Sequence, residues 1–494
     1  MKIEPEQVGW NLGTSKHPHG SDLWVPWDRA AGVIGPQGSG KTLDVLVPTL
    51  LGAPGAAMVT MTKPDDLLLS WTARSSGDRP CAVLDPFGLA EGLPELVWDP
   101  IAGCVDPMVA ERRAKAFAAG TIQGSDSAGN EGAARFYAAE AAKVLKGFFH
   151  AAALAGGTLD DVLRWVANPS AATDATAILQ DHPHAAPFWD GLVYAALHGD
   201  ERTAGNTVTT VQQAMEILFQ EPIRRRCVPG PNRPATNIAE LIHRRGTVYL
   251  LGREDPYASA SPLMTAFAEH MLDTALQAAH RSPWGKLCPP LLAVLDELPS
   301  TAPLPTLRTR MANERALGIS FIWAAQTPAQ LTTIYGKQEA DTLIQLTNNL
   351  LIFGGGKDVT FNQEMSDLLG AVRVGRSTWQ TGKGGRSHSA EDIPVITASE
   401  IRRLEERTAL LVAENSRPII AGLHRCIDGA AGRTLLAEQK QLRERLASEH
   451  GMTVTPEARA TAALVEARRR GLSREKAHQH TAVAPYEQQL QEPR

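Results

Sequence analysis

Near its start the chain reads Gly35-Pro36-Gln37-Gly38-Ser39-Gly40-Lys41-Thr42, which matches the phosphate-binding pattern G-x-x-x-x-G-K-[ST]. The apolar run 30–34 before it predicts a short buried strand. The run 43–51 after it predicts the start of a helix that Pro48 bends or ends. The glycines let backbone N–H groups turn toward phosphate oxygens at the positive end of that helix. Lys41 is expected to reach the β- and γ-phosphates, and the Thr42 hydroxyl to ligate Mg²⁺. A chance glycine-rich turn is the alternative, but the Lys-Thr pair serves no purely structural need.

A second acidic element is needed for hydrolysis, and the best candidate is Leu291-Leu292-Ala293-Val294-Leu295-Asp296-Glu297. Its apolar residues predict a buried strand that delivers two carboxylates to the edge where open α/β sheets bind ligands. Asp296 is expected to hold Mg²⁺ through water, and Glu297 to polarise the attacking water. An ordinary solvated strand end is the alternative. The run ending at Asp85 has a strand and an acid, but it lacks a second carboxylate and lies close to the first loop.

Composition bounds the class of protein. The 494 residues suffice for two domains plus a tail, and the net charge of −5 argues against a uniformly basic nucleic-acid coat. The five cysteines are scattered without a C-x-x-C pair, so neither a zinc site nor a disulfide framework is indicated. The sequence has no apolar run of membrane-spanning length and no signal peptide. We therefore expect a cytoplasmic location, with any association with the inner face of the membrane made through a partner.

The apolar runs alternate with helical patterns, which predicts an α/β fold with a mostly parallel central sheet. Strands are expected at 56–61, 81–84, 246–251, 291–295, 319–324, 350–353, 409–412 and 419–421. Ala-rich helical patterns such as 133–154 replace them between 106 and 240. The predicted organisation is a nucleotide-binding domain in two parts, 1–105 and 241–427, an inserted all-α domain at 106–240, and a charged helical or partly disordered tail at 428–494. The Gly-rich, basic segment 374–392 predicts a mobile loop.

A third group of residues follows the two nucleotide motifs. The run 321–326 predicts a buried strand ending in Gln326, whose amide is expected to contact the γ-phosphate or the attacking water. Further along come Gln330-Leu331, Tyr335-Gly336, Asn348-Asn349 and Asp358. In this order the blocks resemble the conjugative coupling proteins of type IV secretion systems, the TraG/TraD group, which are RecA-like ATPases related to the FtsK translocases. The resemblance covers roughly residues 10–425 and is strongest at 35–42, 296–297 and 319–358.

The resemblance implies a RecA-like P-loop ATPase that uses ATP and Mg²⁺ in a ring, a hexamer, with nucleotide at subunit interfaces and DNA in the central pore. Lys41, Glu297 and Gln326 would then be catalytic residues. Arg315 lies 19 residues after Asp296, a placement similar to the arginine finger of the family. Arg308 and Arg310 are alternatives in the same segment, and Arg29 is a weaker second candidate.

Two features depart from the family. Its members usually carry N-terminal membrane spans, whereas only about thirty residues precede the first motif here. Its D-P-K-G block after the second strand is replaced by Thr62-Lys63-Pro64-Asp65-Asp66. We expect the second departure to matter little, because it is predicted to lie away from the hydrolysis residues.

The functional hypothesis is a coupling protein, a DNA translocase that delivers DNA or a DNA–protein substrate to a type IV secretion (conjugation) apparatus. The expected partners are DNA, single-stranded or duplex, relaxosome-type or other substrate proteins, secretion components and further copies of the chain. The alternatives are a nucleotide-switched adaptor that recruits protein substrates, and an FtsK-like DNA pump. Candidate phosphate contacts for DNA are 224–226, 243–245 and the set Arg373, Arg376, Lys383 and Arg386, although each also reads as a solvated basic run.

Overall fold

A computed structural model describes residues 4–122, 131–252, 259–379 and 386–449. The chain divides into two compact units, Met1–Gln439 and Lys440–Arg494. Of the second unit, the described residues are 440–449, which form the last part of helix α19 (Gly429–Glu449). The sheet, the helices that cover it and the candidate site all belong to the first unit.

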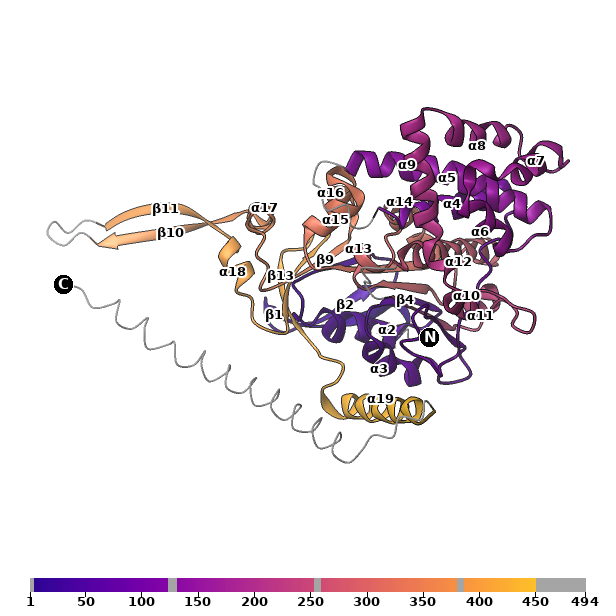
Figure 1. The fold of residues 1–494 in the computed structure, drawn as a ribbon. Coiled ribbons are helices and arrows are strands. Elements are labelled where there is room, and N and C mark those ends of the chain that lie inside the picture. Colours follow the sequence, from indigo (N-terminus) through magenta and orange to yellow (C-terminus); the bar gives the residue numbers. More distant parts are fainter. Residues whose placement is uncertain (1–3, 123–130, 253–258, 380–385, 450–494) are drawn as a thin grey trace, which may run out of the picture. The chain divides into compact units, whose positions relative to one another are not determined.

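An eleven-stranded sheet forms the centre of the first unit, in the order β2-β1-β13-β12-β9-β3-β8-β7-β4-β6-β5 (Figure 1). Neighbours from β9 to β5 run parallel, whereas β12, β13, β1 and β2 are antiparallel. The strands are β1 (Gly9–His17), β2 (Asp22–Pro26), β3 (Ala31–Ile34), β4 (Ala57–Met61), β5 (Cys81–Leu84), β6 (Thr247–Leu251), β7 (Leu291–Leu295), β8 (Ile319–Ala325), β9 (Asn349–Phe353), β12 (Thr408–Ala413) and β13 (Ile419–Leu423).

The parallel strands are buried along their whole length. Every residue of β3 to β9 in this sheet lies in the interior, which explains why these strands appear in the sequence as continuous apolar runs rather than alternating ones. The predicted α/β class with a mostly parallel sheet is confirmed, as are the positions of these strands.

One long ribbon contradicts the sequence-based expectation. Strands β10 (Ala371–Trp379) and β11 (Arg386–Pro394) pair antiparallel from Ala371 opposite Pro394 to Trp379 opposite Arg386. The prediction of a mobile loop over 374–392 is therefore wrong for the described part, while 380–385 lie outside the described residues. The described side chains of the ribbon, at 371–375 and 390–394, are not buried, so they give no burial pattern that periodicity in the sequence could reveal.

Between β5 and β6 the described chain is helical, and Figure 1 shows these helices gathered together beside the sheet. They are α4 (Pro107–Ala119), α5 (Glu131–Leu154), α6 (Leu159–Ala167), α7 (Thr173–Asp181), α8 (Trp189–His198), α9 (Glu201–Met215), α10 (Glu221–Cys227) and α11 (Ile238–His243). The helix expected over 133–154 is confirmed by α5, which buries Val144, Leu145, Phe148 and Phe149 completely.

The helical segment shares its apolar core with the sheet. The Trp98 ring stacks on Phe117 of α4 at 6.1 Å between centroids, and meets Phe267 of α12 (Ser261–Arg281) edge-on at 5.5 Å. The Arg113 guanidinium covers the same indole at 4.7 Å from the ring centroid. One cluster of buried side chains includes Leu84 and Leu250 of the sheet together with Phe117 and Phe148 of the helical segment. The predicted domain boundaries at 106, 240 and 428 stay predictions.

The other helices cover the sheet and connect its strands. They are α1 (Pro5–Val8), α2 (Val47–Gly52), α3 (Pro64–Arg74), α13 (Leu298–Thr301), α14 (Leu307–Asn313), α15 (Pro328–Tyr335), α16 (Lys337–Leu346), α17 (Val359–Leu369) and α18 (Ala398–Arg402). Because β3, β4, β7 and β8 are parallel neighbours in one sheet, the residues that follow them meet at a single edge. This edge carries the candidate site.

Candidate nucleotide-binding site

A cavity of about 380 Å³ opens at the carboxyl edge of the parallel strands. Its lining comes from the loop after β3, the turn after β4, the ends of β7 and β8, and the segment after β13. The lining residues are Gln37, Gly38, Ser39, Gly40, Lys41, Thr42, Leu43, Thr62, Lys63, Asp66, Asp296, Glu297, Ser300, Gln326 and Arg425. The two motifs, some 250 residues apart in sequence, therefore line one cavity.

The glycine-rich loop leaves β3 and passes into a π-helical turn, η1 (Thr42–Leu46), which α2 continues. Gly38 and Gly40 have φ angles of 78° and 103°, a region that favours glycine. Lys41 Nζ donates to the carbonyls of Gly35, at 2.6 Å, and Pro36, at 3.1 Å. Burial lowers the pKa of Lys41, and the carboxylates of Glu297 and Asp296 oppose that shift. A phosphate in the loop would oppose it further, because it would add negative charge beside the ammonium.

Asp296 faces the loop directly. Thr42 Oγ1 donates to Asp296 Oδ2 at 3.1 Å, and Thr60 Oγ1 on β4 donates to the Asp296 carbonyl at 2.8 Å. A hydroxyl and a carboxylate are the hard oxygen ligands that Mg²⁺ selects. The Thr42–Asp296 pair therefore has the chemistry to hold a magnesium ion, and this role stays a prediction.

Glu297 and Gln326 both line the cavity and contact each other. Gln326 Nε2 donates to both Glu297 carboxylate oxygens, each at 3.0 Å. Glu297 has φ 49° and ψ 46°, a left-handed conformation that is costly for a residue with a side chain and clusters at functional sites. Gln326 follows β8, the strand between β3 and β7, so its amide lies between the phosphate loop and the acidic pair. The carboxylate that would activate water is thus oriented by the amide expected to sense phosphate.

Magnesium binding is expected to weaken at acid pH. Burial raises the pKa of the Asp296 carboxyl to about 6, and the nearby Glu297 adds to the rise, while the hydrogen bond from Thr42 opposes it. Below pH 6 the carboxyl is protonated and ligates poorly, so the apparent Mg²⁺ affinity of the nucleotide complex should fall up to about tenfold per pH unit. Titrating Mg²⁺ against the ADP complex at pH 5, 6 and 7.5 measures this. An affinity that does not change between pH 5 and 7.5 would contradict the role of Asp296.

The folded protein should also lose stability as pH rises through the same window. The folded pKa of Asp296 lies above its ordinary value of 3.8, so the native state holds the proton more tightly than the unfolded chain. The contribution of this group to the free energy of unfolding therefore falls between about pH 4 and 6. Asp296→Asn should remove this dependence, which thermal melts at several pH values would show.

Several cavity residues were not predicted from the sequence. Thr62, Lys63 and Asp66 line the cavity, so the expectation that this block lies away from the hydrolysis residues is wrong. The reason is topological, because β4 pairs with β7 and the two strands end side by side. Arg425 follows the last strand of the sheet, and no local pattern marks it. Asp85 by contrast directly follows the edge strand β5, where its side chain accepts a hydrogen bond from Ala90 N at 2.7 Å, and it does not line the cavity.

Arg315 lies outside the cavity of its own chain. It sits in the turn η4 (Arg315–Leu317) just before β8, whereas Gln326 follows that strand. A strand of this length spans roughly 20 Å, so Arg315 lies at the opposite edge of the sheet. Its Nη1 donates to Asn348 Oδ1 at 2.9 Å, and Asn348 Nδ2 donates to Glu414 at 3.0 Å. Arg29 pairs with the same Glu414 carboxylate at 2.7 Å, so both arginines are held at one place.

The other two arginines are engaged elsewhere. Arg310 is buried and forms ion pairs with Glu269, Asp273 and Glu314 at 2.6–2.8 Å, so it cannot reach another subunit. Arg308 is partly exposed and pairs with Glu339 at 2.6 Å. Of the three candidates in this segment, Arg315 has the most suitable position for a contact made across an interface.

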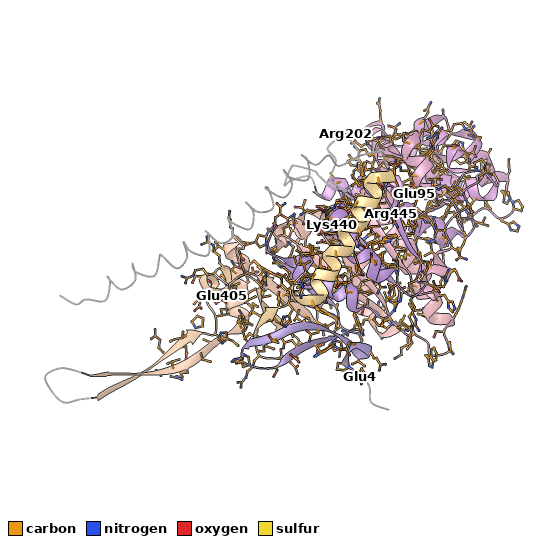
Figure 2. All side chains as sticks on the ribbon, turned by 90° about the horizontal axis from the view of Figure 1, so that it is seen from below. Glu4, Glu95, Arg202, Glu405, Lys440 and Arg445 are labelled. Atoms are coloured by element: carbon orange, nitrogen blue, oxygen red, sulfur yellow. The ribbon has the colours of Figure 1, made fainter. Side chains whose placement is uncertain are left out.

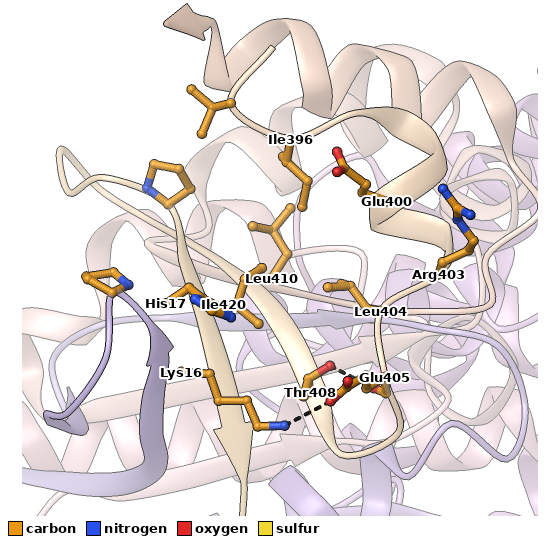
Figure 3. A pocket seen from close by; sticks show the side chains of 13 residues that line it. Lys16, His17, Ile396, Glu400, Arg403, Leu404, Glu405, Thr408, Leu410 and Ile420 are labelled. Atoms are coloured by element: carbon orange, nitrogen blue, oxygen red, sulfur yellow. Dashed lines mark hydrogen bonds and ion pairs between the residues drawn. The ribbon is translucent and has the colours of Figure 1, made fainter. Parts of the chain in front are cut away.

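A second, larger cavity of about 570 Å³ lies among β1, β12, β13 and α18 (Figure 3). Leu410, Ile420 and Ile396 form an apolar part of its wall, and Lys16 Nζ pairs with Glu405 Oε2 at 3.2 Å at its rim. Its lining contains no glycine-rich loop or strand-end acidic pair. Volume alone would favour this cavity, but the chemistry of the lining residues makes the smaller one the candidate nucleotide site.

The basic run 224–226 is matched by carboxylates. Glu95, which is labelled in Figure 2, forms ion pairs with Arg226 at 3.9 Å and with Arg233 at 2.5 Å. The remaining ion pairs are Arg224–Asp160, Arg225–Glu221 and Arg226–Glu91. This run is therefore a weaker candidate for DNA phosphates than its sequence indicates. Arg244 donates to the Asp78 carbonyl at 2.9 Å, and Arg373 is exposed on β10. Lys383 lies outside the described residues, as do the side chains of Arg376 and Arg386.

Comparisons with known proteins agree with this geometry. A family model described as the TraM recognition site of TraD and TraG matches residues 290–406, which include Asp296, Glu297, Arg315 and Gln326. A search of curated proteins finds no match. Among the helices of the described residues, none combines the length and apolar character needed to cross a membrane.

The fold is similar to that of solved conjugative coupling proteins. The unbound monoclinic form of TrwBdeltaN70 aligns with a TM-score of 0.63 at 19% identity, covering 87% of this chain and 91% of that one. TrwB bound to the GTP analogue GDPNP aligns with a TM-score of 0.60 at 19% identity, covering 87% and 92%. TrwB bound to ADP and Mg²⁺ aligns with 0.59 at 19% identity, covering 83% and 88%. Residues 290–406 thus belong to the TraD and TraG family, and the chain has the RecA-like P-loop fold of the conjugative coupling proteins.

Proposed function

We propose that the chain is an ATP-hydrolysing coupling protein that works as a ring and delivers DNA or a DNA-linked protein to a type IV secretion apparatus. The observation that carries the proposal is the convergence of Lys41, Thr42, Asp296, Glu297 and Gln326 on one cavity. TrwB, whose fold this chain shares, has been solved with ADP and Mg²⁺ and with ATP and GTP analogues.

Each residue has a distinct task in this proposal. The loop amides and Lys41 bind and orient the triphosphate, and Thr42 with Asp296 holds Mg²⁺, which would neutralise developing phosphate charge. Glu297 accepts a proton from the attacking water. Gln326 donates to both Glu297 oxygens and so holds the carboxylate in position. Positioning and charge stabilisation account for most of the catalysis of phosphoryl transfer, so a fixed amide–carboxylate pair suits the task.

The position of the arginines supports assembly into a ring. Arg315 and Arg29 are held together at the edge of the sheet opposite the cavity, so they can complete only the site of another copy. In a head-to-tail ring every copy would offer its cavity to one neighbour and its arginines to the other. Nucleotide turnover would then depend on assembly.

The first experiment measures ATP hydrolysis by the full chain with and without single-stranded and duplex DNA. Hydrolysis stimulated by DNA, together with assembly beyond the monomer, would support the proposal. Failure of either DNA to stimulate, with a protein that stays monomeric at working concentration, would contradict the motor.

Lys41→Ala is the companion variant. Removing a charge-assisted hydrogen-bond donor to phosphate should raise the Kd for ATP by about 10- to 100-fold and reduce hydrolysis to background. Fluorescent-nucleotide titration measures the Kd. Partner capture by the wild type that changes with bound nucleotide but needs no hydrolysis would favour the nucleotide-switched adaptor instead. Unchanged ATP binding would contradict the assignment of the loop itself.

A further inference from the structure

We propose that Arg425, held by Asp44, is the side chain on which the base of the bound nucleotide stacks. The inference rests on the proposed nucleotide site and adds to it a residue for the nucleoside end of the ligand. Such a contact would make purine nucleotides the preferred substrates, because a flat cation interacts best with a large aromatic ring.

Asp44 fixes the plane of the guanidinium. Its side chain is completely buried in η1, two residues after Thr42, and accepts from Arg425 Nε at 2.6 Å and Nη2 at 3.0 Å. Because Asp44 contacts only Nε and Nη2, it occupies neither the flat face of the guanidinium nor Nη1. The hydrogen bonds also raise the pKa of Arg425, so the group stays charged.

The position of Arg425 matches the nucleoside end of the site. The γ-phosphate end of the cavity is defined by Lys41, Thr42, Asp296, Glu297 and Gln326. The amides of the phosphate loop would bind the α- and β-phosphates.

Arg425 contacts the other side of the loop. A Cβ atom added to Gly40 would lie 3.0 Å from Arg425 Nη2, and the next residue, Cys426, donates its N–H to the Leu43 carbonyl at 3.0 Å. The guanidinium therefore borders the cavity beside Gly40 and Leu43, and this is where the proposal places the nucleoside of a bound nucleotide.

A purely structural clamp would not require this arrangement. The Arg425 side chain keeps 26% of its surface exposed and lines the cavity. The pair with Asp44 is neutral overall, so it offers little net charge to phosphates, and a planar face is its main recognition feature. Stacking and one hydrogen bond from Nη1 are then the expected contributions to binding.

The test compares the binding of a nucleotide with that of an inorganic polyphosphate, which has neither base nor ribose. The Kd of the full chain for ADP and the competing affinity of tripolyphosphate are measured in the presence of Mg²⁺. Arg425→Ala should raise the Kd for ADP about tenfold and leave the affinity for tripolyphosphate within about twofold. Arg425→Lys keeps an ion pair with Asp44 but has no flat face, so it should bind ADP nearly as weakly as Arg425→Ala. ADP should also bind more tightly than CDP to the wild type, and this preference should shrink in both variants.

Arg407 provides the matched control. It pairs with Asp428 at 2.6 Å and so ties down the same segment, but it does not line the cavity. Arg407→Ala should therefore leave both affinities unchanged.

Three results would overturn the inference: unchanged ADP binding by Arg425→Ala, equal loss of ADP and tripolyphosphate, or full rescue by lysine. A wild-type chain that binds neither ligand would instead overturn the nucleotide site as a whole, so the two failures are distinguishable.

Discussion

Replacing Glu297 by glutamine is expected to lower kcat for ATP hydrolysis by at least about a hundredfold while ATP binding is kept. The amide has nearly the shape of the carboxylate but cannot accept the proton from the attacking water. It would also face the Gln326 amide, whose Nε2 now donates to both Glu297 oxygens at 3.0 Å. The substitution leaves Lys41, Thr42 and Asp296 unchanged, so the binding of phosphate and metal should persist.

Single-turnover hydrolysis and nucleotide titration on the same preparation separate the two effects. Asp85→Asn is the matched control, because Asp85 also follows a buried parallel strand but lies outside the cavity. It should hydrolyse ATP as the wild type does. If Glu297→Gln turns over normally, the general base is another residue, and the roles given to both Glu297 and Gln326 fail.

Some of the site was predictable because its residues follow buried strands. Lys41 and Thr42 follow β3, Asp296 and Glu297 follow β7, and Gln326 follows β8. A parallel sheet brings such strand ends to one edge whatever their separation in sequence. Continuous apolar runs made these strands visible, so the predicted fold and the convergence of the motifs had one physical origin.

Other features depend on tertiary contacts that carry no local signal. Lys63 and Asp66 reach the cavity because β4 pairs with β7, a neighbour that only the strand order reveals. Arg425 is held at the cavity by a hydrogen-bonded ion pair with Asp44, which lies 381 residues away in the sequence. The β10–β11 ribbon is paired only with itself, so its residues show neither the continuous nor the alternating apolar pattern that marks a buried strand.

Arg315→Ala is expected to lower hydrolysis by the assembled protein by about a thousandfold, with little change in nucleotide binding. An arginine supplied by a neighbour acts mainly on the charge that develops in the transition state, so kcat should fall and the Kd should not. Arg308→Ala is the control, because Arg308 comes from the same segment and is tied to Glu339 instead. It should retain nearly full activity.

The decisive form of this experiment mixes two inactive proteins. Arg315→Ala keeps an intact phosphate loop, and Lys41→Ala keeps an intact Arg315. In a ring with random order, about a quarter of the interfaces would pair the good cavity of one with the good arginine of the other. Hydrolysis should therefore reappear on mixing, although neither variant hydrolyses ATP alone. If the mixture stays inactive while the two proteins assemble together, Arg315 does not act across the interface. Its bond to Asn348 and the link to Arg29 through Glu414 would then only hold together the edge of the sheet.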